Sequence, residues 1–163
     1  MMKKAAAFLL LVCVLLPSFV LSVSAENSGL NEASSRADGS KIVYLDDGGY
    51  LLISPVREVE AGNRTTITRA RDVTHYDSDD EVEWKYTLTG TFTYTYGVSA
   101  TCTNAYYTQT INDDSWTFSD GDATRTGATA HGVGTYVKKF WFITIQTINV
   151  DISLTCDIYG NVT

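Results

Sequence analysis

Large and hydroxyl-bearing side chains alternate along residues 84–102. The even positions are mostly aromatic or apolar, from Trp84 through Tyr86 and Phe92 to Cys102, whereas the odd positions from 85 to 95 hold one lysine and then five threonines. A period of two places the two sets on opposite faces of a β-strand. The alternation therefore predicts a long strand with one buried face and one threonine-rich outer face.

The same alternation returns near the C-terminus, at residues 148–158. The even positions are apolar or cysteine and the odd positions are hydrophilic, so this segment is predicted to be a second half-buried strand. Gly90 and Gly97 interrupt the central stretch, and we expect them to mark bulges or bends. Cys102 and Cys156 each fall on the apolar face of their strand.

The remaining segments favour further strands separated by turns. We expect a hairpin from 41–45 and 50–53, a second from 57–60 and 65–68, a strand over 105–111, a turn over 119–122, an exposed edge strand over 123–134 and a central strand covered on both faces over 136–145. No helical period occurs after residue 25. Seven to nine short strands with frequent turn residues predict an all-β chain, a single antiparallel β-sandwich, with a barrel as the second choice.

The N-terminal segment has the pattern of a secretory signal peptide. Two lysines precede the uninterrupted apolar run 5–16, Pro17 ends that run, and small residues follow up to Ala25. This order predicts cleavage after Ala25 and a secreted, extracellular protein. A retained membrane anchor is the alternative, because the apolar run approaches the length of a membrane span.

Residues 26–40 are polar and aperiodic, which predicts a flexible leader before a domain at 41–163. Loss of the two signal-peptide lysines changes the formal net charge from −7 to −9. An acidic surface repels phosphate backbones, so nucleic acid is not an expected partner. We expect no membrane span after cleavage.

Cys102 and Cys156 form an even pair in a chain predicted to be exported. Both lie on apolar strand faces, so a disulfide is the expected state. In the chain-entropy model, closing a loop of this length contributes about 4 kcal/mol.

Motifs for catalysis are not visible in the sequence. There is no GxSxG elbow, and the two histidines, His75 and His131, are far apart in sequence. Either histidine could act as a general base, but no nucleophile and orienting group accompany it, so we expect no catalytic residues and a protein that is not an enzyme.

One compact acidic segment has the hard oxygen ligands that calcium prefers: Asp77, Asp79, Asp80 and Glu81. Val82 stands where an EF-hand has glycine, and a solvated surface loop explains the same residues. We therefore expect no cofactor and keep calcium at this loop as the alternative.

Ten tyrosines and three tryptophans suggest a sugar-binding surface, because aromatic rings stack on pyranose faces. Most of them lie on alternating apolar faces and are expected in the core. The aromatic residues less clearly buried are the candidates for a binding patch, namely Tyr50, Tyr106, Tyr107, Trp116 and Tyr159.

Three features of the chain are similar to those of a group of known proteins. They are the signal peptide, the Thr/Tyr-rich strands and the closing segment Leu154-Thr155-Cys156-Asp157-Ile158-Tyr159-Gly160-Asn161-Val162. The chain resembles small exported proteins of Gram-positive bacteria that form an uncharacterised family of unknown function. The resemblance implies export and a β-rich fold, and it transfers no catalytic or binding residues.

Together these features predict a non-catalytic extracellular domain that binds a glycan or a cell-surface protein. A secreted bacteriocin-like or immunity effector is the alternative, and a hydrolase without a recognisable motif is the third possibility. Sedimentation with cell-wall material would identify a binding domain. Killing or protection in a culture overlay would identify an effector.

Overall fold

The computed structural model describes residues 31–60 and 65–163. The predicted signal peptide and the link between the predicted strands 57–60 and 65–68 lie outside the described residues. The described residues form ten strands and no helix: β1 (Asn31–Ser35), β2 (Lys41–Tyr44), β3 (Tyr50–Ile53), β4 (Arg57–Glu60), β5 (Thr66–Tyr76), β6 (Val82–Thr95), β7 (Ser99–Ile111), β8 (Trp116–Thr126), β9 (Thr129–Phe140) and β10 (Ile143–Thr155).

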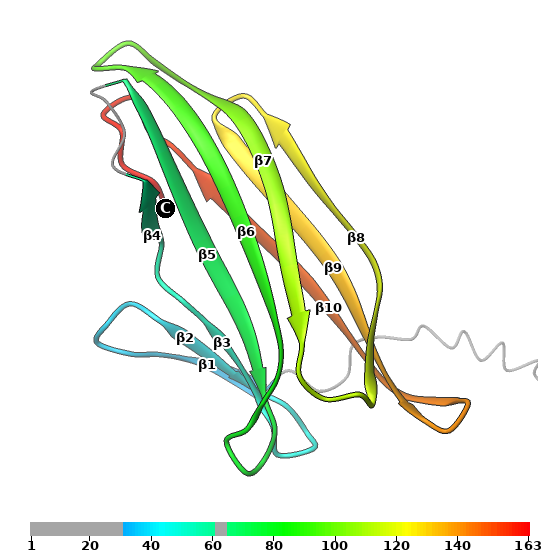
Figure 1. Cartoon of the computed structure of the whole chain (residues 1–163). Helices are drawn as coiled ribbons and strands as arrows, with labels where there is room; N and C mark the ends of the chain where they lie inside the picture. Colours follow the sequence, from blue (N-terminus) through cyan, green and yellow to red (C-terminus); the bar gives the residue numbers. More distant parts are fainter. Residues whose placement is uncertain (1–30, 61–64) are drawn as a thin grey trace, which may run out of the picture.

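The strands form two antiparallel sheets that face each other (Figure 1). The first sheet has the order β1-β2-β3-β5-β6-β7, with β4 also paired to β5, and the second has the order β10-β9-β8. The core lies between the sheets. The predicted β-sandwich is confirmed, and the sheets do not close into a barrel.

Strand β6 carries the central alternation as the sequence predicts. Trp84, Tyr86, Leu88 and Phe92 are fully buried on its inner face and form the middle of the core. The predicted stretch is two strands of a hairpin, because the chain reverses between β6 and β7 at Gly97, whose φ is +71°. A positive φ suits glycine, which has no Cβ to clash with the backbone.

Gly90 has a different role from the one expected. A Cβ at this position would lie 2.7 Å from the Phe92 ring, so the glycine leaves space for the core. The register shift between β6 and β7 falls one residue later, between Thr91 and Phe92.

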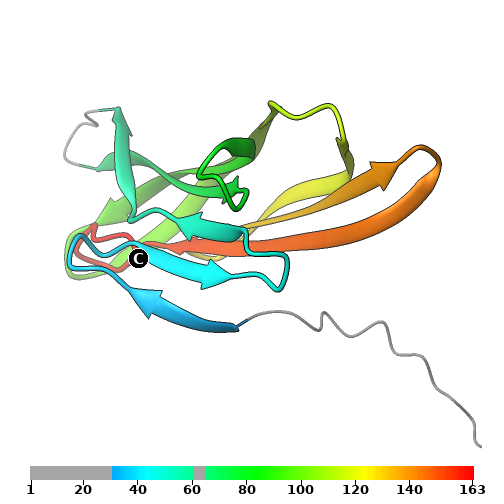
Figure 2. The same cartoon turned by 90° about the horizontal axis from the view of Figure 1, so that it is seen from below.

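Strands β3 and β4 pair with the two halves of β5 along one edge. β3 pairs with residues 73–76 and β4 with residues 68–70 of that strand. Between them the chain bends at Pro55, where Ser54 N donates to Asp72 O and Asp72 N donates to Ser54 Oγ. Because of this bend, β1, β2 and β3 form an arm that turns away from the plane of β5–β7 (Figures 1 and 2).

The two sides of the sandwich differ. On one side β7 approaches β8, where Tyr107 Oη donates to Gly121 O and Arg125 Nη1 donates to Thr103 O. On the other side β10 is the edge of its sheet, and the arm lies beside it (Figure 2). The sandwich is therefore joined on the β8 side and open on the β10 side.

Three segments depart from the predicted pattern. β1 lies within the stretch 26–40 predicted to be a flexible leader, because it pairs with β2 from Asn31 onward. The turn predicted at 119–122 is a register shift inside β8, between Phe118 and Asp120, so β8 continues through it. The predicted edge strand at 123–134 is the second half of β8 and the first part of β9, joined by a turn at Gly127.

Candidate binding surface

A groove of about 700 Å³ lies on the open side of the sandwich. Its floor and walls are apolar and come from the arm and from β10, with Val43, Leu45, Leu51 and Ile53 on one side and Ile148, Val150 and Ile152 on the other. The alternation of β10 directs these last three residues between the sheets. The groove is thus an apolar opening to the core that runs along the edge of β10.

The edge of β10 is largely unpaired. Among the described residues β9 is the one strand paired with β10, and Thr163 pairs with Thr155 at its end, so the other side of β10 presents backbone N–H and C=O groups next to the groove. Side chains of the first sheet contact this strand at two points: Arg71 Nη1 donates to Ser153 O at 3.0 Å, and Asp47 Oδ2 accepts from Gln146 Nε2 of β10 at 2.8 Å. A strand edge of this kind is a template for pairing with another extended chain.

The rim of the groove is acidic. Asp46, Asp47 and Asp151 line it, and the one cation there, Lys138, is already bound to Glu83. The groove therefore combines apolar walls, strand-edge hydrogen-bonding groups and negative charge.

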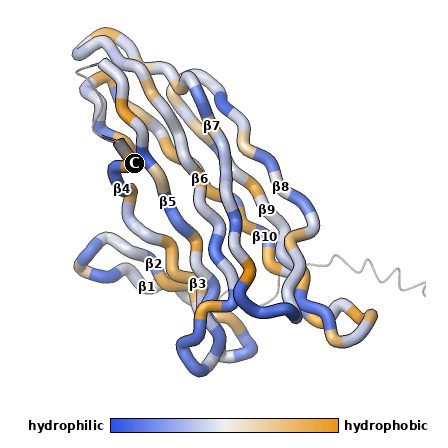
Figure 3. Tube along the Cα trace, in the orientation of Figure 1, coloured by the Kyte–Doolittle hydropathy of each residue, from blue (hydrophilic) through white to orange (hydrophobic). Residues whose placement is uncertain are grey.

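Beyond one end of the groove, the β9–β10 hairpin projects past the rest of the protein (Figures 1 and 2). We call residues 140–145 the hairpin tip. Its large apolar side chains lie in solvent: Phe140 is 65 % exposed, Trp141 84 % and Phe142 84 %, and both isoleucines are more than half exposed. Orange segments mark the tip in the hydropathy colouring (Figure 3).

The tip contradicts the prediction of a doubly covered central strand over 136–145. Consecutive apolar residues predict burial on both faces, but here the chain reverses at Trp141 and Phe142, so that Ile143 pairs back onto Phe140. No glycine, asparagine or proline marks this turn in the sequence, and the usual turn signal is therefore missing.

A buried polar cluster fixes the base of the hairpin. Glu83 on β6 has a side chain only 6 % exposed, and its Oε1 accepts a hydrogen bond from Lys138 Nζ on β9 at 2.7 Å. Its Oε2 accepts from Trp116 Nε1 at 2.9 Å. Lys138 Nζ also lies 5.4 Å from the centre of the Trp116 ring. These contacts tie both sheets together where the projecting hairpin begins.

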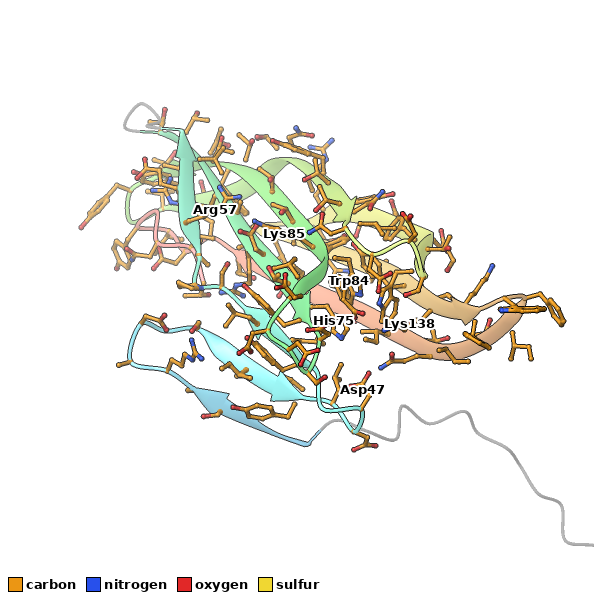
Figure 4. The ribbon with its side chains drawn as sticks, turned by 60° about the horizontal axis from the view of Figure 1, so that its bottom comes forward. Asp47, Arg57, His75, Trp84, Lys85 and Lys138 are labelled. Atoms are coloured by element: carbon orange, nitrogen blue, oxygen red, sulfur yellow. The ribbon has the colours of Figure 1, made fainter. Side chains whose placement is uncertain are left out.

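His75 belongs to this cluster and is buried, with a side chain 1 % exposed. Its Nδ1 lies 2.8 Å from Glu83 Oε2, outside hydrogen-bond geometry, and its ring stacks on Trp84 with 5.2 Å between centres. Burial lowers the pKa of His75 to about 4. Figure 4 shows His75, Trp84 and Lys138 in the same region, with Asp47 on the adjacent β2–β3 turn. His75 is therefore neutral at pH 7.

His131 lies elsewhere, on the outer face of the second sheet, where its Nε2 is 2.8 Å from Asp151 Oδ1. The structure does not bring the two histidines together. The buried cluster around His75 was not predicted, because its members come from four different strands and no spacing in the sequence links them.

The predicted aromatic patch is not assembled. Trp116 is buried, Tyr50 stacks on Tyr76, and Tyr107 stacks on Tyr86 between the sheets. Tyr106 is exposed on β7, and Tyr159 is exposed in the C-terminal turn against Tyr96. These five candidates lie on different elements, and the clustered exposed aromatics are those of the hairpin tip.

The acidic loop over 77–81 joins β5 to β6 and is closed by its own hydrogen bonds. Asp77 Oδ1 accepts from the backbone N–H groups of Asp79 and Glu81, and Asp80 Oδ1 accepts from Tyr50 Oη. Within the described residues no group of three or more His, Cys, Asp or Glu side chains is arranged to hold a metal ion.

The predicted disulfide is not formed in this structure. Cys102 and Cys156 are free, buried thiols, and their Sγ atoms donate to the carbonyl oxygens of Asn104 and Asp157. Burial raises the pKa of both thiols, and oxidation proceeds through the thiolate, so the buried protonated form resists it. Both cysteines bind the β8–β9 turn through their backbone N–H groups.

Comparison with known proteins finds no relative of this chain. No protein-family model, curated protein or solved structure matches the chain. The part of the chain that the structure describes contains no helix that could cross a membrane.

Proposed function

We propose that this protein is an exported, non-catalytic binding domain, related to the uncharacterised exported proteins of Gram-positive bacteria that its sequence resembles. The unpaired edge of β10 beside an apolar groove supports this function best. Strand edges bind by backbone hydrogen bonds, and neighbouring pockets accept alternate side chains of the bound segment.

Of the two ligand classes expected, a cell-surface protein fits the groove better than a glycan. Sugar sites need convergent polar groups and exposed rings, whereas the groove walls are aliphatic. An extended polypeptide segment with alternating apolar side chains matches both the strand edge and the walls. The acidic rim at Asp46, Asp47 and Asp151 favours a segment that also carries Lys or Arg.

The histidines support a non-catalytic role. His75 is enclosed in the core, and His131 faces Asp151 on the outer face of a sheet, without a nucleophile in contact. Neither histidine lines the groove. A hydrolase requires a general base beside the bound substrate, and neither histidine is placed to fill that role in the groove.

Sedimentation of residues 26–163 with bacterial cells tests this proposal. We expect retention on intact cells, and loss of retention after the cells are treated with protease to remove surface proteins. The variant Val43→Arg places a cation in the groove wall and should reduce retention at least tenfold, whereas Thr108→Arg on the exposed face of β7 should leave it unchanged.

Three results contradict the proposal. Retention on purified peptidoglycan or polysaccharide would identify a glycan ligand, and equal retention of the Val43→Arg variant would place the site outside the groove. Failure to sediment with any of these materials, with and without calcium, would remove the binding function and leave a secreted effector to be tested in a culture overlay.

A further inference from the structure

We propose that the hairpin tip inserts into the interfacial region of a phospholipid bilayer. This inference goes beyond the proposed function, although the tip and the groove share one residue, Ile145. Five of the six residues over 140–145 are large and apolar, and all five are exposed on a hairpin that projects from the body (Figures 1 and 2). Trp and Phe side chains are favoured at the membrane–water interface.

The backbone of the turn is strained, and no buried contact in the described part of the chain offsets the strain. Trp141 has a φ of +60° and Phe142 does not share a positive φ, which is the pattern of a type II′ turn with tryptophan where that turn has glycine. A bulky residue with positive φ is an outlier. The ring of Trp141 is 84 % exposed, so buried packing within the chain does not offset the strain. An external partner explains why tryptophan occupies this position.

The tip and the strand segments next to it carry no negative charge of their own. No Asp or Glu occurs from residue 123 to 150, although the whole chain carries 19 acidic residues. Lys139 is exposed at the start of the tip and adds positive charge there. The tip therefore meets a bilayer with a lysine and without a carboxylate of its own, and it projects beyond the acidic β2–β3, β5–β6 and β7–β8 turns at the same end of the sheets (Figures 1 and 2).

A sugar and a protein fit the tip less well. Thr144 supplies the one polar side chain over 140–145, and sugar recognition requires several convergent polar groups. A specific protein interface involves about 20–30 residues a side, which a six-residue tip on a projecting hairpin does not provide. A bilayer requires only that apolar side chains reach it.

Vesicle binding of residues 26–163 tests the inference, since the described fold lies within this fragment. We expect the protein to sediment with phosphatidylcholine vesicles, because the apolar side chains of the tip carry the binding. Trp84 and Trp116 are buried and Trp141 is exposed, so Trp141 reports binding by a blue shift of its fluorescence. The vesicles should also protect Trp141 from an aqueous quencher.

The double variant Trp141→Gly with Phe142→Asn separates binding from folding. Gly-Asn suits the type II′ turn, so this variant should be at least as stable as the native chain. Loss of two inserted aromatic side chains should weaken vesicle binding about a hundredfold. The matched control replaces Tyr96 with Asn and Val98 with Ser, which are exposed in the β6–β7 turn at the other end of the sheets, and should bind as the native chain does.

Absence of vesicle binding, or equal binding by the turn variant, would overturn the inference. Self-association that the turn variant abolishes, or retention on polysaccharide that it abolishes, would assign the tip to a second copy or to a glycan instead. Because Val43→Arg alters the groove and not the tip, it should bind vesicles normally. The two proposals can therefore fail separately.

Discussion

Replacement of Lys138 by Met tests the buried cluster at the base of the hairpin. Methionine keeps most of the side-chain length and removes the ammonium group that donates to Glu83 Oε1. Removing one partner of a buried ion pair costs about 3–5 kcal/mol, because the other charge is left unpaired. Trp116 still donates to Glu83, and Lys138 is 24 % exposed, so we expect the lower value, about 3 kcal/mol at pH 7.

The pH dependence distinguishes lost charge from lost packing. Burial raises the pKa of Glu83, and the hydrogen bonds from Lys138 and Trp116 offset part of that rise. Without Lys138 the pKa rises further, so the variant gains stability as the pH falls and the carboxylate is protonated. The deficit relative to the native chain should therefore be largest at pH 7 and should shrink as the pH falls toward the unfolded value for glutamate.

Urea unfolding followed by circular dichroism at pH 7 and pH 5 measures this deficit. Lys139→Met is the matched control, because Lys139 is the exposed neighbour, and it should change the free energy of unfolding by less than about 0.5 kcal/mol. A deficit for Lys138→Met that is the same at both pH values would refute the electrostatic argument and assign the loss to the packing of the lysine stem.

The remaining predictions concern other buried groups. The pKa of His75 is lowered to about 4, so the stability that comes with its neutral ring is fully present above pH 6.5. On the order of 3 kcal/mol of the free energy of unfolding is lost as the pH falls to about 4. His75→Phe should make the free energy of unfolding less dependent on pH over this range. Burial of Asp72 opposes ionisation, but hydrogen bonds from Lys85, Arg57 and Thr87 lower its pKa. Asp72→Asn should therefore cost about 1–3 kcal/mol of the free energy of unfolding at pH 7, and the difference should vanish in acid, where native Asp72 is protonated. Equal costs at pH 7 and pH 2 would contradict this. Iodoacetamide in urea without reductant should label both Cys102 and Cys156, whereas the native protein should react slowly. If neither cysteine is labelled in urea, the two are joined in a disulfide.

The strands and their buried faces could be predicted from the sequence because period two is a local signal. The alternations around Trp84 and Ile148 each appear within one segment, and the structure buries most of the residues they select. Tyr96, Val98 and Ile158, which lie in turns, are exposed. The β2–β3 hairpin was also predicted, since Asp46–Gly49 carries the residues that such turns favour. The ion pair of Glu58 with Arg69 confirms the expected pairing of β4 with β5.

The binding surface could not be predicted, because it depends on which strands become neighbours. The groove exists because β3 and β4 share β5 and the arm turns toward β10, an arrangement that no local pattern encodes. The tip was missed for a different reason. Consecutive apolar residues normally indicate burial, and a turn made of Trp141 and Phe142 lacks the residues by which turns are recognised.

The bend at Pro55 has a consequence for the dynamics of the groove. β3 holds the arm to β5 through four residue pairs, whereas β5 and β6 pair along nearly their whole length. A unit attached through so few pairs opens at a lower free energy than the rest of the fold. Amide hydrogen exchange should then be faster in β1–β3 than in β5, β6 and β9, and a segment bound in the groove should slow it. The arm would act as a hinged wall, so that the entry rate of a ligand reflects the local unfolding of three strands.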